Sequence, residues 1–219
     1  MKLAVFSDFD GTISKRDVGY SLFHHFSGGK NDALLPDWKS GKMSTRDCLL
    51  AEAAMVDAPA DEILAFIDKI GIDDYFDEFA FICNRDNIPL TIVSDGLDFY
   101  IRHLLTKSGH DNLTFMANKS ELVNNTVRIT FDHENESCER CGICKGEVIQ
   151  KFRNLQTEET KVIFIGDGYS DVCAAKEADI LFAKKDLKIF CDEKKIDYFT
   201  YKTFDDIIIK LNEMQLITR

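Results

Sequence analysis

Short apolar runs alternate with segments of helical spacing along most of the chain. The first run covers residues 3–6, and later runs cover residues 89–93, 113–117, 161–165 and 180–183. Unbroken runs of this length are typical of parallel strands that are buried on both faces. Helical spacing occurs between or after these runs, at residues 97–107, 146–155, 171–178 and 204–216. The alternation predicts βαβ units and an α/β fold built on a parallel sheet.

Two segments depart from this alternation. Residues 14–85 contain few β-rich runs but several amphipathic stretches, at 18–26, 45–55, 61–70 and 75–85. We expect a helical insertion over the strand ends, where it can act as a lid. Asn124-Asn125 separates two β-rich runs within residues 121–131, which predicts a hairpin. The predicted organisation is a Rossmann-like core of residues 1–13 and 86–219 with a helical cap of residues 14–85.

Composition and charge narrow the classes of partner. The net charge of −11 argues against a nucleic-acid partner, because nothing suggests a basic face. No stretch is long and apolar enough to suggest a membrane span. We expect no cleavable signal, since Met1-Lys2 leads straight into the first predicted strand. The seven cysteines are an odd number, which favours free thiols in a reducing cytoplasm.

Polar residues follow several of the predicted strands. Asp8-Phe9-Asp10-Gly11-Thr12 follows the first, Ser94-Asp95-Gly96 follows the second, and Gly166-Asp167 begins a segment that reaches Asp171. Ligands of open α/β sheets bind beyond the carboxyl ends of the strands. Lys145 stands at the start of a predicted helix. We expect these residues to meet at one edge of the sheet.

This set of residue types suits the hydrolysis of a phosphomonoester, which needs a nucleophile, a proton donor and positive charge. Asp8 can attack phosphorus and form an aspartyl-phosphate, while Asp10 can reach the leaving oxygen. Gly11 permits close backbone approach, and Thr12 can hydrogen-bond the phosphate. Two carboxylates facing a dianion require a cation, and their oxygen ligands favour Mg²⁺.

The phosphoryl group itself needs donors and positive charge. Ser94 offers a hydroxyl, with Asp95 and Gly96 beside it, and Lys145 offers a compact cation. Taken singly, these features have ordinary interpretations: Asp-x-Asp as a turn, Ser94 as a cap, Lys145 as a solvated charge and Gly-Asp-Gly as a turn. Their occurrence together, in a workable order, favours catalysis.

The four motifs resemble those of the haloacid dehalogenase (HAD) superfamily of phosphohydrolases. That pattern is Asp-x-Asp-x-Thr, then Ser or Thr, then Lys, then Gly-Asp-x-x-x-Asp, and its counterparts span essentially the whole chain. The resemblance implies a nucleophile at Asp8, a general acid/base at Asp10, and phosphoryl binding by Ser94 and Lys145. It also implies a Mg²⁺ site formed by Asp8, the backbone carbonyl of Asp10, Asp167 and, in support, Asp171.

The predicted cap looks like that of the phosphoserine-phosphatase-like branch of this superfamily. Asp17 falls where phosphoserine phosphatases carry a substrate-binding Glu, and Arg46 falls near their cap Arg. The resemblance therefore implies that both residues contact substrate. Two ordinary alternatives stay open: Asp17 as a charge in the first turn of a helix, and Arg46 as part of a solvated face.

A cysteine-rich stretch, Cys138-Glu139-Arg140-Cys141-Gly142-Ile143-Cys144, directly precedes Lys145. It is similar to stretches in two groups of the superfamily, the methionine-salvage enol-phosphate phosphatases and the phosphoethanolamine/phosphocholine phosphatases. Its three thiols could hold zinc, with His133 or another Cys as the fourth ligand. Free thiols, or a redox-sensitive pair, are the alternative.

We therefore expect a cytoplasmic, Mg²⁺-dependent phosphatase that acts on a small phosphorylated metabolite as a monomer or homodimer. The substrate classes left open are the salvage enol-phosphate, phosphoserine, and phosphocholine or phosphoethanolamine. Two other functions also stay open: a phosphotransferase of the same fold, and a non-catalytic binding or regulatory module. The set of Asp8, Asp10, Ser94, Lys145 and Asp167 weighs against the last of these.

Overall fold

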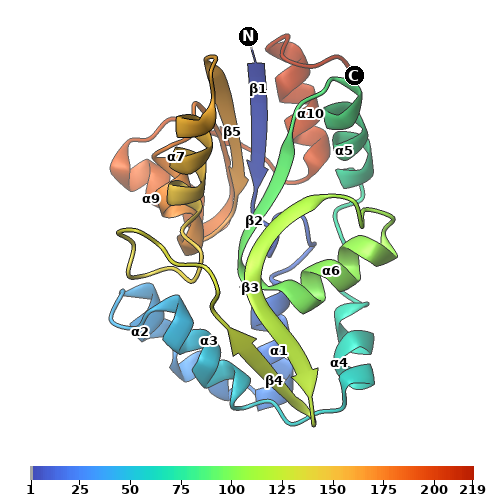
Figure 1. Cartoon of the computed structure of the whole chain (residues 1–219), viewed down its shortest axis with the longest axis vertical. Helices are drawn as coiled ribbons and strands as arrows, with labels where there is room; N and C mark the ends of the chain where they lie inside the picture. The colour runs from blue at the N-terminus through green and yellow to red at the C-terminus, as the bar shows by residue number, and fades with distance from the viewer. Residues whose placement is uncertain (1) are drawn as a thin grey trace.

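The computed structural model describes residues 2–219, so Met1 of the predicted core lies outside the described residues. A seven-stranded sheet runs through the molecule in the order β4-β3-β2-β1-β5-β6-β7 (Figure 1). All neighbouring strands are parallel except β3 and β4. The strands are β1 (Lys2–Ser7), β2 (Leu90–Leu97), β3 (Thr114–Val123), β4 (Thr126–Thr130), β5 (Thr160–Gly166), β6 (Ile180–Ala183) and β7 (Phe199–Thr200). The predicted α/β fold with a parallel sheet is confirmed.

Helices cover both faces of the parallel strands, which explains the unbroken apolar runs. Alternate residues of β1 serve opposite faces: Val5 packs in one buried cluster, and Ala4 and Phe6 pack in the other. The first cluster includes residues of α5 (Phe76–Arg85), α6 (Asp98–Lys107) and α10 (Phe204–Glu213). The second includes residues of α7 (Lys145–Leu155), α8 (Val172–Ala175) and α9 (Lys185–Lys194). Burial on two faces leaves no polar side to these strands.

Four further helices lie at the carboxyl ends of the strands, in the lower half of Figure 1. They are α1 (Val18–Ser27), α2 (Leu35–Lys39), α3 (Thr45–Ala53) and α4 (Ala60–Ile67), with the short 3₁₀ helix η1 (Lys30–Ala33) between α1 and α2. Here α3 contacts β4, and α4 contacts α6. α5, although inside residues 14–85, packs against α10 and β2 on the sheet.

The predicted hairpin is present as β3 and β4, which pair antiparallel from Val123 and Thr126 outwards. Its turn is formed by Asn124 and Asn125, both with positive φ, at 49° and 63°. Two successive positive φ values are what a two-residue hairpin turn needs, and Asn tolerates them. Among residues 2–219, none of the helices combines the length and apolarity that crossing a bilayer requires.

Candidate active site

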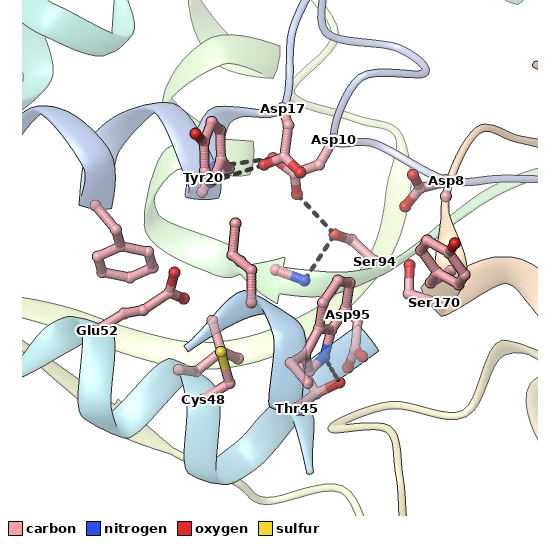
Figure 2. A pocket seen from close by; sticks show the side chains of 18 of the residues that line it. Asp8, Asp10, Asp17, Tyr20, Thr45, Cys48, Glu52, Ser94, Asp95 and Ser170 are labelled. Carbon is pink, nitrogen blue, oxygen red and sulfur yellow. Dashed lines mark hydrogen bonds between the residues drawn. The ribbon is translucent and has the colours of Figure 1, made fainter. Parts of the chain in front are cut away.

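The carboxyl ends of β1, β2 and β5 meet at one cavity, and residues of α1, α2 and α3 line its other side (Figure 2). The β1 end brings Asp8 and Asp10, the β2 end brings Ser94, and the β5 end brings Asp167. The amide of Asp8 donates to the carbonyl of Ile165 at 2.9 Å, which aligns the β1 and β5 ends. The structure therefore brings together the predicted residues of three motifs. The cavity is further lined by Asp17, Tyr20, Phe23, Trp38, Cys48, Leu49, Glu52, Tyr100 and Ser170.

Lys145, the first residue of α7, reaches the carboxylate of Asp8 at the same site. Its ammonium lies 2.6 Å from Asp8 Oδ1 and also contacts Asp171 Oδ1. The Lys145 side chain has 0% exposure and that of Asp8 4%. Burial lowers the pKa of Lys145, but the carboxylates of Asp171 and Asp8 outweigh burial and leave this pKa raised. Lys145 is therefore a buried partner of Asp8 whose charged form is favoured by its two carboxylate neighbours.

Asp171 organises the turn that follows β5. Its Oδ2 accepts hydrogen bonds from the amides of Asp167 at 2.8 Å and Gly168 at 2.9 Å, while its Oδ1 faces Lys145. Gly166 allows this close approach, because a Cβ there would lie 2.5 Å from Asp171 Oδ2. Both oxygens of Asp171 are thus engaged, and the residue positions Lys145 and Asp167.

The three carboxylates Asp8, Asp167 and Asp171 offer oxygens that lie within 4.8 Å of one another. Burial, then the neighbouring Asp171, raises the pKa of both Asp8 and Asp167. Only part of this negative charge is offset by Lys145 and by Lys185, whose ammonium lies 2.8 Å from Asp167 Oδ2. A hard divalent cation with oxygen ligands, such as Mg²⁺, fits this donor set. Asp8 and Asp167 are the side chains best placed to hold it, since Asp171 is already engaged.

The Asp10 carboxyl is held by four donors. Oδ1 accepts from the amides of Val18 at 2.9 Å and Gly19 at 3.2 Å, and Oδ2 accepts from Tyr100 at 2.8 Å and Ser94 at 3.2 Å. Burial is the largest effect on Asp10 and leaves its pKa raised despite these hydrogen bonds. The carboxyl is therefore fixed in orientation and biased towards the protonated form.

Gly96 and Tyr100 pack closely against the Asp10 carboxyl. A Cβ on Gly96 would lie 1.9 Å from the Tyr100 hydroxyl oxygen and 2.4 Å from Asp10 Oδ2, so only glycine fits here. The Gly96 amide donates to Ser94 Oγ at 2.9 Å. Tyr100 and Lys185 were not predicted from the sequence. The signal for Tyr100 was weak: it lies one helical turn after Gly96 on an apolar helix, where an aromatic residue usually belongs to the core.

Thr12 and Asp95 lie at the margins of the site. Thr12 is buried, and its Oγ1 accepts a hydrogen bond from the Tyr201 hydroxyl at 3.4 Å. Asp95 lines the cavity, but its Oδ1 accepts from the amide of Ile143 at 2.8 Å. It thereby anchors the cysteine-rich stretch to the end of β2.

Of the two cap candidates, Asp17 faces the cavity and Arg46 is engaged elsewhere. Asp17 is the N-cap of α1, because its Oδ1 accepts from the amide of Tyr20 at 2.8 Å. The Arg46 guanidinium donates to the carbonyls of His133 and Gly142 and lies over the ring of Phe131. Arg46 thus ties α3 to the segment before α7, and its contact with substrate stays a prediction.

Glu52 of α3 is a second acidic group on the side of the cavity that α1, α2 and α3 line. It is 6% exposed, and Asn31 Nδ2 donates to its Oε1 at 3.0 Å. Burial raises the pKa of Glu52 to about 7. For Asp17, burial and then the nearby Asp10 raise the pKa to about 8. This side of the cavity is therefore lined by two carboxyls with raised pKa values, and a bound cation would favour their charged form.

Glu52→Gln is expected to change how stability depends on pH. A pKa of about 7 in the folded state, above the ordinary 4.5, means that the folded protein holds a proton which the unfolded chain releases. Stability from this group is therefore lost as pH rises from 4.5 through 7, by at most roughly 3 kcal/mol. The glutamine variant should show a smaller fall in thermal midpoint between pH 5 and pH 8. Glu62→Gln, at an exposed site on α4, is the control; equal falls in both variants would contradict the assignment.

Comparison with known proteins extends these observations. A model of the "Putative Phosphatase" family matches residues 2–198. A 2-hydroxy-3-keto-5-methylthiopentenyl-1-phosphate phosphatase of Lysinibacillus sphaericus is 31% identical, over 98% of this chain and 96% of its own length. The enzyme of the same name from Bacillus mycoides is 28% identical, over 98% of both chains.

Solved structures show the fold. A phospho-aspartyl intermediate analogue of phosphoserine phosphatase is similar with a TM-score of 0.70 and 20% identity, over 95% of this chain and 98% of that chain. A HAD family hydrolase from Salmonella enterica serovar Typhi gives a TM-score of 0.72 at 18% identity, over 94% of this chain and 71% of that one. With the family model covering most of the described residues, this chain belongs to the Putative Phosphatase family and is a phosphatase with the HAD fold.

Proposed function

We propose that this phosphatase uses Asp8 as its nucleophile and acts on a small phosphorylated metabolite, with 2-hydroxy-3-keto-5-methylthiopentenyl-1-phosphate as the first candidate. The observation that carries the proposal is the buried contact of Lys145 with Asp8, which lines the cavity at the strand ends. Relatives named for this substrate match along nearly the whole chain, so the cap as well as the core has counterparts in them.

The proposed reaction has two displacements at phosphorus. Asp8 attacks phosphorus, the bond to the substrate oxygen breaks, and protonated Asp10 gives its proton to that oxygen. Asp10, now a carboxylate, takes a proton from a water molecule that attacks the aspartyl-phosphate and releases phosphate. Lys145 and Ser94 hold the phosphoryl oxygens. A Mg²⁺ ion held by Asp8, Asp167 and the backbone carbonyl of Asp10 would supply positive charge to the phosphoryl group.

We further propose that α1 to α4 form a cap, joined by the outer part of the β3–β4 hairpin. The contacts of α3 with β4 and of α4 with α6 support this grouping. The contacts of α5 with α10 and β2 favour a boundary before residue 76, rather than at residue 85. Cap residues Phe23, Leu49 and Trp38 give the cavity an apolar side that would exclude water and accept a small organic group.

A second substrate class is favoured by one feature of the cavity. Asp17 and Glu52 lie on its cap side together with the aromatic side chains of Tyr20 and Trp38. Carboxyls with aromatic rings suit an ammonium group, as in phosphoethanolamine or phosphocholine. Phosphoserine is less well served, because its carboxylate needs a cation and the Arg46 guanidinium is held by backbone carbonyls.

The test is a Mg²⁺-dependent phosphate-release screen with Asp8→Asn as the control. The panel contains the salvage enol-phosphate, phosphoethanolamine, phosphocholine, phosphoserine, pyridoxal phosphate and sugar phosphates. A strong preference for the enol-phosphate, lost in the variant, is the expected result. Preference for an ammonium-bearing ester would instead support the second class. A phosphorylated product that appears only when an acceptor alcohol is added would establish a phosphotransferase.

Asp167→Asn is expected to weaken stabilisation by Mg²⁺. A ligand that binds the folded state at a hundred-fold excess over its Kd stabilises it by about 2.7 kcal/mol. In the wild type, added Mg²⁺ should therefore raise the thermal midpoint by several degrees, and the variant should lose most of this rise. Asp61→Asn, at an exposed position of α4, should keep it. An equal rise in both variants would remove Asp167 from the metal site.

We also propose the cytoplasm as the compartment. None of the seven cysteines is in a disulfide, as expected where thiols are kept reduced. Whether the protein is a monomer or a homodimer stays a prediction, which its mass in solution would decide.

A further inference from the structure

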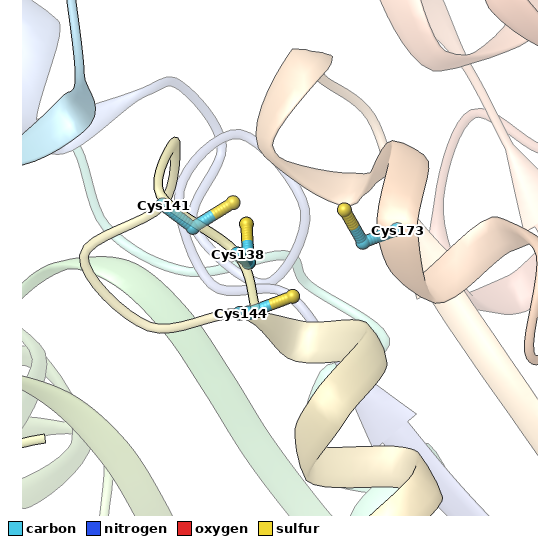
Figure 3. Close-up of side chains that lie close together, drawn as sticks. All are labelled: Cys138, Cys141, Cys144 and Cys173. Carbon is cyan, nitrogen blue, oxygen red and sulfur yellow. The ribbon is translucent and has the colours of Figure 1, made fainter. Parts of the chain in front are cut away.

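Four cysteines from two separate segments point into one small space beside the active site (Figure 3). Cys138, Cys141 and Cys144 lie in the irregular segment before α7, and Cys173 lies in α8 across from them. Their four sulfur atoms all lie within 4.8 Å of one another, and none is in a disulfide. The three other cysteines of the chain, Cys48, Cys83 and Cys191, are buried singly.

The segment that carries three of these thiols is held by dedicated hydrogen bonds. The Glu147 carboxylate accepts from the amides of Ser137 at 2.9 Å and Cys138 at 2.8 Å. Asn135 donates to the carbonyls of Cys138 at 3.1 Å and Cys141 at 2.8 Å, and accepts from the amide of Cys144 at 2.8 Å. These hydrogen bonds fix the backbone in a conformation that brings the three thiols of this segment together.

A four-sulfur cluster has few chemical explanations. A disulfide joins two sulfurs and would leave the other two without a role, whereas a tetrahedral metal uses all four. Zinc bound at about 2.3 Å by each of four thiolates places the sulfurs roughly 3.8 Å apart, within the observed limit. We propose that Cys138, Cys141, Cys144 and Cys173 form a structural zinc site. Cys173, and not His133, supplies the fourth ligand.

The consequence of this site is a cross-link between two parts of the active site. Cys144 immediately precedes Lys145, and Cys173 lies two residues after Asp171. At the same place α7 meets α8 closely, since a Cβ on Gly146 would lie 2.8 Å from the Cys173 carbonyl oxygen. Zinc would hold the segment before α7 against α8 and so fix the Lys145–Asp171 contact. The four cysteines would thus act by positioning Lys145 and Asp171, and the zinc itself takes no part in the reaction.

The first test measures the metal content of the wild-type protein, purified under reducing conditions from zinc-supplemented medium. We expect about one zinc per chain. Replacing zinc by cobalt distinguishes a metal at the four thiols from a metal at the active-site carboxylates. Only thiolate ligands give an intense sulfur-to-cobalt charge-transfer band. Release of one zinc per chain by a thiol-specific mercurial would also show that thiolates hold the metal, without replacing zinc by cobalt.

The variants are Cys173→Ser and, as a matched control, Cys83→Ala at a buried thiol in α5. Cys173→Ser should lose zinc and the cobalt band, and should unfold at a lower temperature; Cys173→His should keep a tetrahedral site with an altered cobalt spectrum. The control should keep full zinc. Wild-type protein that is zinc-free, with seven titratable thiols or with a disulfide within the four, would overturn the proposal, as would bound iron. None of these readouts depends on the substrate or on phosphatase activity.

Discussion

Asp8→Asn is expected to lower phosphatase turnover by about 10⁴-fold or more while leaving the fold intact. Replacing a nucleophile removes the covalent route altogether, and losses of this size are usual for such changes. An amide also cannot form the acyl phosphate that the second displacement requires. The measurement is kcat with the best substrate of the screen at saturating Mg²⁺. Near-wild-type turnover would remove Asp8 from the reaction.

The same variant is expected to be at least as stable as the wild type in the absence of divalent cations. Within residues 2–219, the three buried carboxylates of Asp8, Asp167 and Asp171 form ion pairs with Lys145 and Lys185 alone. Loss of one negative charge balances the cluster, and Lys145 keeps Asp171 as its partner. Removing one member of a buried ion pair is usually strongly destabilising, so an unchanged or higher thermal midpoint would be a specific sign of repulsion within this cluster. A large drop would mean that the Asp8–Lys145 contact outweighs that repulsion.

The sheet could be predicted because its central strands are buried on both faces. In β1, Val5 serves one face and Ala4 and Phe6 the other, which leaves an unbroken apolar run in the sequence. The α9 helix was missed because little of it is buried: of its ten residues only Leu187 and Cys191 are. The side chain of its N-cap residue, Lys184, also makes no capping hydrogen bond to the first turn of the helix. A helix without a strong apolar stripe or a side-chain cap is difficult to predict from the sequence.

The residues of the candidate site also fall into two groups, those that the sequence could predict and those that it could not. Asp8, Ser94 and Asp167 could be predicted because strand ends carry them, and parallel strands end at one edge of the sheet. Tyr100 and Lys185 could not, because they reach the site from the first turns of α6 and α9, whose placement depends on tertiary packing. Cys173 is a similar case. The three cysteines before Lys145 form a local motif, whereas the fourth thiol is brought to them only by the packing of α7 against α8.

Asp10→Asn is expected to separate the two displacements of the proposed reaction. The amide keeps an acceptor for the amides of Val18 and Gly19, so the fold should survive. With an alkyl phosphate, kcat should fall by about 10²- to 10⁴-fold, the usual contribution of general acid–base catalysis. With p-nitrophenyl phosphate, whose leaving group departs without a proton, the first displacement should be largely spared. The second still lacks its base, so p-nitrophenol should appear in a burst of about one equivalent per chain, followed by slow turnover.

Tyr100→Phe provides the comparison that makes this result specific to Asp10. It removes the 2.8 Å hydrogen bond to Asp10 Oδ2 but leaves the carboxyl in place. The lost hydrogen bond stabilises the charged form, so its removal should raise the pKa of Asp10 further and shift the pH profile of kcat to higher pH. No burst of p-nitrophenol should appear in this variant. Rapid chemical quench and phosphoenzyme trapping distinguish the two variants. If alkyl and nitrophenyl esters lose the same factor in Asp10→Asn and no burst forms, then Asp10 neither donates the proton nor activates water, and its four hydrogen bonds serve only to shape the site.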